Sequence, residues 1–277
     1  MSTSPRKSPA PIPILVYHSV SADPAPWIAP YTVSASVLRS HLDRIVERGL
    51  HTLQISELTE MLDSHEPLAA GSLCITIDDG FADSLGTVGP EIAERGLSAT
   101  LFVTTGALRD GPVGSRSRLG ESPMLHWSDL PDLEQLGIEI GSHSETHPPL
   151  DVVEGSLLAR ELSLSKQKLE DFLGHGVRSF AYPHGFYDRR AVAAVAEAGY
   201  DSAVAVRNAF SSAADDRFSR ARLMIRADTP FHLVDAWLSG VGAPVAPFPV
   251  RLRTRVWRLR RRVSELAYTR AGEWKGS

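Results

Sequence analysis

Residues 73–80 read Leu-Cys-Ile-Thr-Ile-Asp-Asp-Gly, a short apolar run that ends in two carboxylates and a glycine. An apolar run of this length beside a turn residue is typical of a strand buried in a parallel sheet. Successive side chains on a strand point to opposite faces, but before Gly80 the backbone can twist so that Asp78 and Asp79 reach one pocket. Taken alone, such a sequence is more often a capped polar turn than a catalytic pair.

Short apolar runs and helical patterns alternate along the chain on both sides of this stretch. The predicted strands are residues 12–17, 73–77, 99–103, 138–141, 177–182, 202–206 and 223–225. The predicted helices are residues 36–48, 56–62, 90–95, 128–136, 154–172, 189–198 and 231–238. This alternation is typical of α/β folds with mostly parallel strands. We therefore predict a distorted (β/α) barrel of about seven parallel strands, similar to the TIM fold but with fewer units.

The composition is that of an ordinary globular protein. The chain has 277 residues, of which 43% are hydrophobic and 22% charged, which excludes the disordered and membrane classes. The formal net charge of -4 gives no sign of nucleic-acid binding. The single cysteine, Cys74, excludes a disulfide framework and a cysteine-rich metal site, which leaves Asp and His as metal ligands. No apolar stretch of signal-peptide length precedes Tyr17, so we expect a cytoplasmic protein.

A second polar segment follows a predicted strand, where residues 141–148 read Gly-Ser-His-Ser-Glu-Thr-His-Pro. His143 and His147 are four residues apart and can address one cation, and the proline after them favours a loop over a helix. Two histidines with one Asp make a divalent site with open positions, and a second carboxylate can deprotonate water there. The same ligands fit a non-haem iron oxygenase, but a second Asp and a parallel barrel favour metal-assisted hydrolysis.

Two further segments carry candidate catalytic groups. Residues 180–185 read Phe-Ala-Tyr-Pro-His-Gly, a strand that leaves into a turn where the backbone N–H of His184 can donate to an oxyanion. His18 stands at the end of the first predicted strand and can protonate a leaving amine. Each histidine, taken alone, is better explained as an ordinary hydrogen-bonded side chain.

These motifs occur in an order and spacing that resembles the NodB-homology polysaccharide deacetylases, carbohydrate esterase family 4. The resemblance covers residues 13–240, and the Tyr-His-Ser-Val of residues 17–20 is most similar to the branch with poly-β-1,6-N-acetylglucosamine deacetylases. It implies a metal-dependent hydrolase that removes N-acetyl groups from N-acetylated glycans. The alternatives are a metal-dependent amidase for a small non-glycan carbon–nitrogen bond and a non-catalytic glycan-binding protein.

The resemblance also implies a role for each motif residue. Asp78 is the expected general base, and Asp79, His143 and His147 are the expected ligands of a divalent metal, Zn2+ first and Ni, Co or Fe as alternatives. His18 matches a histidine that serves as general acid in the poly-N-acetylglucosamine branch, where it replaces the C-terminal Leu-x-His motif of other members. That motif is missing here, so the resemblance assigns the role of general acid to His18.

The chain departs from the family pattern after the third motif. Many members have Arg-Pro-Pro-Tyr-Gly where residues 181–185 read Ala-Tyr-Pro-His-Gly, so the arginine that orients the base is absent there. Arg222 is a candidate replacement, although a surface arginine explains it equally well. The backbone N–H of His184 is the expected oxyanion donor. The candidate substrate-binding residues are Trp127, Tyr182 and Pro183.

The C-terminal region differs in charge from the rest of the chain. Residues 248–277 carry nine basic and two acidic residues, with an apolar stripe at helical spacing. We predict three parts: a disordered N-terminal segment (1–12), the deacetylase domain (13–240), and a Pro-containing linker with a basic amphipathic helix (241–277). Residues 250–268 are suited to peripheral contact with the inner face of a membrane, or to docking on the barrel or a second subunit. Apart from the glycan, the sequence indicates neither a protein partner nor a nucleic acid.

Overall fold

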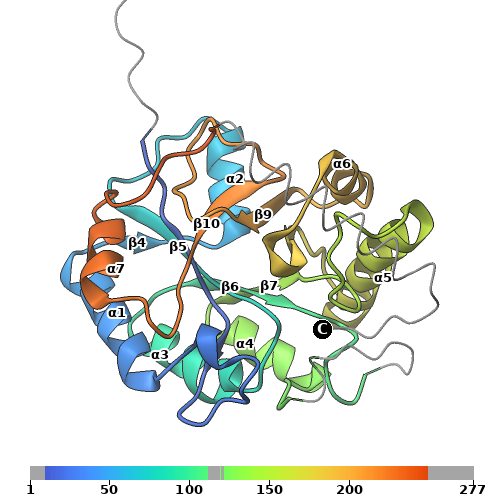
Figure 1. Ribbon diagram of the computed structural model, residues 1–277, viewed down its shortest axis with the longest axis horizontal. Coiled ribbons are helices and arrows are strands. Elements are labelled where there is room, and N and C mark those ends of the chain that lie inside the picture. The colour runs from blue at the N-terminus through green and yellow to red at the C-terminus, as the bar shows by residue number, and fades with distance from the viewer. Residues whose placement is uncertain (1–9, 112–118, 120–121, 249–277) are drawn as a thin grey trace, which may run out of the picture.

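The computed structural model describes residues 10–111, 119 and 122–248, and within them seven parallel strands close into a barrel (Figure 1). Each strand pairs with the next along the chain, and the first pairs with both the second and the last, which closes the ring. The strands are β1 (Ile14–Tyr17), β5 (Ser72–Ile77), β6 (Ala99–Val103), β7 (Ile138–Ser142), β8 (Ser179–Ala181), β9 (Ser202–Val206) and β10 (Arg220–Met224). The predicted distorted (β/α) barrel is confirmed.

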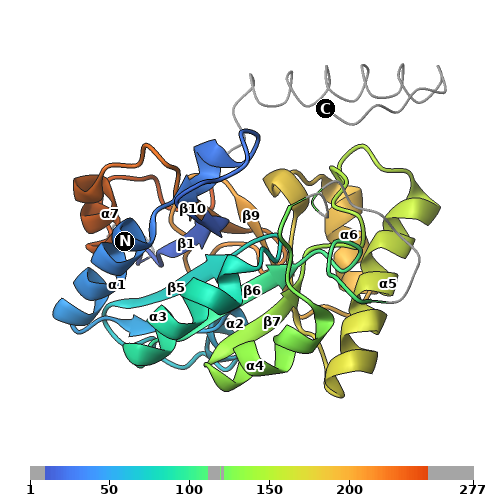
Figure 2. The same cartoon turned by 90° about the horizontal axis from the view of Figure 1, so that it is seen from below.

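Helices cover the outside of the barrel, as the side view shows (Figure 2). They are α1 (Ala35–Glu47), α2 (Ile55–Asp63), α3 (Gly89–Glu94), α4 (Leu130–Gln135), α5 (Gly155–Leu173), α6 (Arg189–Glu197) and α7 (Phe231–Leu238). Local sequence signals set their ends: the Ser34 hydroxyl accepts the Val37 N–H at the start of α1, and Gly174 ends α5 with a φ of 78°. Each predicted helix is present, with its ends within two residues of the prediction. In the 128–136 prediction, the first residues form a 3-10 turn.

Several short elements have no counterpart among the predictions. Strands β2 (Ser19–Val20) and β3 (Thr32–Val33) form a separate pair, and β4 (His51–Thr52) adds to the edge of β5. At two residues each, they are too short to show a hydrophobic period. A π-helical turn (Ser84–Val88) leads into α3.

Strand side chains alternate between two cores. One face packs against the helices, and the other fills the barrel interior with residues such as Cys74, Phe102 and Val204, against which Ile55 of α2 packs. Gly141 on β7 makes room for this interior, because a Cβ atom there would lie 2.6 Å from the Phe102 ring. The barrel is therefore a filled core, and function is confined to its ends.

The sequence analysis predicts a separate segment at each end of the chain, residues 1–12 and 241–277. Ile12, at the edge of the predicted N-terminal segment, is buried and pairs with Ser211, while residues 1–9 lie outside the described residues. Part of the predicted linker packs on the barrel, where the Ala246 N–H donates to the Phe210 carbonyl at 2.9 Å. The predicted basic helix, with residues 250–268, lies outside the described residues. No helix that the structure describes combines the length and apolar character needed to cross a bilayer.

Candidate active site

The predicted functional segments meet at one end of the barrel. Asp78 and Asp79 follow β5 and His143 follows β7, and because all barrel strands are parallel, their carboxyl ends open on the same face. Asp79, His143 and His147 converge so that one ligand atom from each lies within 4.8 Å of the others. The structure thus brings together the three residues predicted to hold a metal.

The geometry of these three residues fits a divalent cation. Asp79 Oδ1 lies 3.2 Å from His147 Nε2 and 3.5 Å from His143 Nε2. Two ligands that each lie ~2.1 Å from one tetrahedral ion are roughly 3.4 Å apart, so the spacing matches. His143 Nδ1 donates to the Ala181 carbonyl at 2.7 Å, which leaves the Nε2 lone pair facing Asp79. Asp79 Oδ1 is buried and has no hydrogen-bond partner among the described residues, as expected for an atom that binds a metal.

The backbone around this cluster is unusual. Seven non-glycine residues of the described chain have a positive φ, and four of these belong to the site: Asp79 (79°), Ser144 (67°), His147 (63°) and His184 (59°). This left-handed conformation costs such residues of order 1 kcal/mol or more. The surrounding fold must therefore hold these turns in place.

The predicted base makes a buried ion pair with Arg222 of β10. The guanidinium donates to both Asp78 oxygens, with distances of 2.7 Å to Oδ1 and to Oδ2, and also to Thr76 Oγ1 at 3.1 Å. Arg222 is fully buried, so the alternative that it lies on the surface is wrong. Burial by itself would raise the pKa of Asp78, but the charge of Arg222 and its hydrogen bonds hold that pKa below its ordinary value. The carboxylate is therefore ionised at neutral pH.

His18 and His184 flank the cluster. His18 Nδ1 is buried without a hydrogen-bond partner among the described residues, and the ring lies 5.5 Å from that of Tyr31. His18 follows Tyr17, which is paired with Ile77 of β5 and accepts the Asp78 N–H at 3.0 Å, so His18 and Asp78 leave neighbouring strands at the same end of the barrel. His184 lies in the turn after β8, with its ring 4.5 Å from that of His147. Both histidines are thus within the same site, and their roles stay predictions.

The three candidate substrate-binding side chains are buried. Trp127 packs edge-on against Phe172, with ring centroids 5.3 Å apart, and the Tyr182 hydroxyl donates to the Phe218 carbonyl at 2.8 Å. Pro183 is buried in the turn that carries His184. Contact with a substrate stays a prediction for these three.

One residue in contact with the site was not singled out by the sequence patterns. Glu161 of α5 accepts hydrogen bonds from the loop between His143 and His147. The sequence did contain one signal. Glu161 lies among the buried residues Leu158, Leu162 and Ser165 of α5, and a charged residue is rarely buried unless it is paired.

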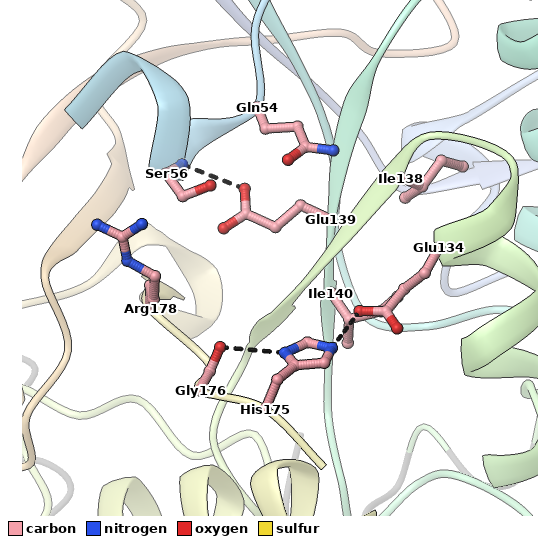
Figure 3. A pocket seen from close by; sticks show the side chains of 9 residues that line it. All are labelled: Gln54, Ser56, Glu134, Ile138, Glu139, Ile140, His175, Gly176 and Arg178. Atoms are coloured by element: carbon pink, nitrogen blue, oxygen red, sulfur yellow. Dashed lines mark hydrogen bonds and ion pairs between the residues drawn. The ribbon is translucent and has the colours of Figure 1, made fainter. Parts of the chain in front are cut away.

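A cavity of about 230 Å³ lies at the opposite end of the barrel, beside the start of β7 (Figure 3). Its charged side chains already have partners. His175 pairs with Glu134 at 2.9 Å and Arg178 with Asp201 at 2.5 Å, and Glu139 accepts hydrogen bonds from Ser56, Thr100 and Ser179. None of the predicted site residues lines it. The chemistry suggested by the sequence therefore belongs to the carboxyl end alone.

The fold is a closed parallel barrel, and its carboxyl end carries one Asp and two His side chains beside a second, buried carboxylate. These features define a class of (β/α)-barrel proteins with a site suited to a divalent metal. The polysaccharide deacetylase family model matches residues 65–203, half of the chain, and the chain belongs to this family. The Bacillus subtilis (strain 168) protein YxkH, whose name provisionally assigns it to the polysaccharide deacetylases, is 26% identical over 198 residues. That match covers 72% of this chain but only 65% of the length of YxkH.

Solved structures share the fold. The Streptococcus pyogenes deacetylase PplD, in complex with acetate, has a TM-score of 0.70 at 24% identity, over 80% of this chain and 95% of that one. A de-N-acetylase from Aggregatibacter actinomycetemcomitans has a TM-score of 0.71 at 20% identity, over 80% and 98%. IcaB from Ammonifex degensii has a TM-score of 0.68 at 20% identity, over 83% and 97%. At these identities the similarity establishes the barrel fold.

Proposed function

We propose that this chain is a metal-dependent hydrolase that removes N-acetyl groups from N-acetylated glycans. The observation that carries the proposal is the buried Asp78–Arg222 pair beside the Asp79, His143 and His147 cluster. An ionised carboxylate next to a metal site is the arrangement that hydrolysis of an amide by water needs. Membership of the polysaccharide deacetylase family supports a glycan as the substrate.

Asp79, His143 and His147 would hold the metal, and we propose Zn2+, with Ni, Co or Fe as alternatives. A bound divalent ion supplies a Lewis acid that polarises a carbonyl and lowers the pKa of water. The uncharged Nε2 atom of His143 suits such an ion, since burial lowers the pKa of His143 to about 4.

Asp78 accepts the proton of the attacking water. Its Oδ2 atom lies 3.8 Å from His143 Nε2, on the side that faces the metal ligands. Each carboxylate oxygen has two acceptor positions, so Oδ2 can bind Arg222 and still accept a proton. The two parallel hydrogen bonds from Arg222 fix the plane of the carboxylate and thus the direction of that acceptor.

His18 and His184 complete the proposed reaction. The backbone N–H of His184 donates to the oxygen that gains charge as water attacks, and His18 gives a proton to the departing amine. Support for His18 comes from its position directly after β1, next to the end of β5 that carries Asp78. Trp127, Tyr182 and Pro183 shape the acetyl pocket from behind.

The decisive experiment combines metal analysis with acetate release. Purified protein loaded with Zn2+ would be incubated with β-1,6-linked and β-1,4-linked N-acetylglucosamine oligomers and with small cyclic amides and formamides. We expect one metal per chain and acetate from the oligomers. Hydrolysis of the small amides alone would favour the amidase, and glycan binding without acetate release would favour a non-catalytic protein.

We further propose a cytoplasmic location with peripheral contact at the inner face of the membrane through residues 250–268. The support is the basic, amphipathic character of that segment in the sequence. Co-sedimentation with anionic vesicles tests it, with the variant Arg260→Glu, Arg261→Glu, Arg262→Glu as comparison. Equal sedimentation of both proteins would overturn this proposal.

A further inference from the structure

Helix α5 turns a polar face toward the barrel. Glu161, Ser165 and Lys168 are spaced by four and three residues and so lie on one side of the helix. Glu161 and Ser165 are buried, and the Lys168 side chain is 16% exposed. Burial of polar and charged groups is costly unless they are paired, so we expect these three side chains to have specific partners.

The contacts of Glu161 all go to the loop that carries the metal ligands. Its Oε2 atom accepts the backbone N–H of Glu145 at 3.0 Å and that of Thr146 at 2.8 Å. Its Oε1 atom accepts the Thr146 hydroxyl at 2.6 Å. One carboxylate thus binds three donors that lie between His143 and His147, and hydrogen bonds to an ionised acceptor are among the stronger ones.

The other two residues of this face hold the same loop. Ser165 Oγ lies 2.8 Å from the hydroxyl of Ser142, which directly precedes His143. Lys168 Nζ lies 2.7 Å from Glu145 Oε1. The loop is therefore tied to α5 at its start and at its middle.

The loop needs this support because of its backbone. Ser144 and His147 have φ values of 67° and 63°, in the left-handed region that favours glycine. A free loop of this sequence would populate other conformations, in which the two imidazoles would no longer face Asp79. Glu161 favours the observed conformation because only there do the Glu145 and Thr146 donors point to one carboxylate.

We infer that Glu161 is a positioning residue for the metal site: it fixes the loop so that both imidazoles are aligned before the metal binds. The inference rests on the proposed function for the presence of the metal. Groups that orient metal ligands typically contribute about 10- to 100-fold to metal affinity. The substitution Glu161→Gln keeps the size of the side chain but replaces one acceptor oxygen with an amide that donates.

The test is metal affinity measured without reference to activity. Wild type, Glu161→Gln and Thr146→Val would each compete with a chromophoric chelator for Zn2+, and the Co2+ forms would be compared by visible absorption. We expect Kd to rise about 10- to 100-fold in Glu161→Gln, with an altered Co2+ spectrum. Thr146→Val keeps the backbone N–H and loses only the hydroxyl contact, so we expect a smaller loss, of roughly threefold to tenfold.

Glu170→Gln is the matched control, because Glu170 lies on the same helix but binds Lys166 and the Val177 N–H. It should destabilise the metal-free protein without changing Kd for the metal. Wild-type affinity in folded Glu161→Gln would overturn the inference. If Glu161→Gln fails to fold, an unchanged Kd in Thr146→Val overturns it instead.

The outcomes also separate this inference from the proposed function. A wild-type chain that binds metal but releases no acetate from any glycan contradicts the function and leaves the positioning role supported by the Kd values. A wild-type chain that is active while Glu161→Gln keeps its affinity contradicts the positioning role alone. A wild-type chain that binds no divalent ion overturns both.

Discussion

Arg222 and Asp78 are 144 residues apart in the chain and form a fully buried pair in which each carboxylate oxygen accepts one guanidinium N–H at 2.7 Å. Burial by itself raises the pKa of Asp78, and the guanidinium of Arg222 opposes this effect. The arginine thus favours the ionised form of the proposed base and fixes the orientation of its carboxylate. The chain has no arginine at position 181, where many members of the family carry one, and β10 supplies the guanidinium.

Replacing Arg222 should change both activity and stability. In Arg222→Gln the Asp78 carboxylate loses its charged partner, so its pKa rises and the acid limb of the pH–rate profile moves to higher pH. We expect acetate release at pH 7 to fall about 10²- to 10⁴-fold. Because a buried charge is left unpaired, we also expect a loss of about 3–5 kcal/mol in the free energy of unfolding.

A pH–rate profile and urea unfolding check this prediction. Arg178→Gln is the control, because Arg178 forms a partly exposed ion pair with Asp201 that contributes about 0–1 kcal/mol. An acid limb that stays at its wild-type pH in Arg222→Gln would contradict the proposed role of the pair.

Without one of the predicted metal ligands, Zn2+ should no longer raise the Tm of the protein. A ligand that binds only the folded state stabilises it by about 2.7 kcal/mol at 100 times its Kd. We therefore expect Zn2+ to raise the Tm of the wild type and a chelator to reverse the effect. His143→Ala should show neither change and no acetate release, and it should also lose some stability because the Ala181 carbonyl loses its donor. A Zn2+-dependent Tm shift in His143→Ala would exclude His143 as a ligand.

The sequence was sufficient to predict the barrel and the polar residues at the strand ends. Several tertiary contacts that complete the site could not be predicted from it. Asp78 and Asp79 were visible because an apolar run leads straight to them and Gly80 follows. Arg222 could be named only as a candidate, because its pairing with Asp78 joins β10 to β5, 144 residues earlier in the chain. The left-handed backbone of Ser144 has no local signal either, since tertiary contacts impose it against intrinsic preference.

His18 is predicted to protonate the leaving amine, and the leaving group offers a test. An amine must be protonated to depart, whereas 4-nitrophenolate departs without help. In His18→Gln we expect acetate release from N-acetylated oligomers to fall about 10²- to 10⁴-fold, while hydrolysis of 4-nitrophenyl acetate stays within a few-fold of wild type. His51→Gln, at an exposed position on β4, is the control. Equal losses on both substrates would exclude the role of general acid.

His41 should make stability depend on pH. It is buried in α1, where Nδ1 lies 3.0 Å from the Tyr17 hydroxyl, and burial lowers its pKa from 6.5 to about 4. Between these values the unfolded chain binds a proton that the folded chain does not, so stability present above pH 6.5 is lost as the pH falls. The slope is about 1.4 kcal/mol per pH unit, and the loss is complete near pH 4.

The check compares urea unfolding of wild type and His41→Gln at pH 7 and pH 5. Other groups, including His143, titrate in both proteins and cancel in the difference. We expect the wild type to lose about 2 kcal/mol more than the variant between these two pH values. Parallel losses in the two proteins would show that His41 does not stay neutral in the folded state.

Gly185 should be required for the turn that carries His184. Its φ is 70°, and a Cβ atom there would lie 2.6 Å from Val206 Cβ and 2.8 Å from the Val206 backbone nitrogen. Gly185→Ala therefore combines backbone strain with a clash against β9 that only a shift of the turn can relieve. We expect a loss of roughly 2–4 kcal/mol in the free energy of unfolding and a reduced kcat, because the shift moves the proposed oxyanion donor.

Gly174→Ala separates the two effects. Gly174 has a similar φ of 78° at the end of α5, but a Cβ atom there meets nothing within 4 Å. Only the strain of about 1–2 kcal/mol applies, so stability should fall modestly and kcat should stay at its wild-type value. If both variants lose the same stability and both keep kcat, the close approach of Gly185 to Val206 does not constrain the turn, and the position of His184 must be fixed by other contacts.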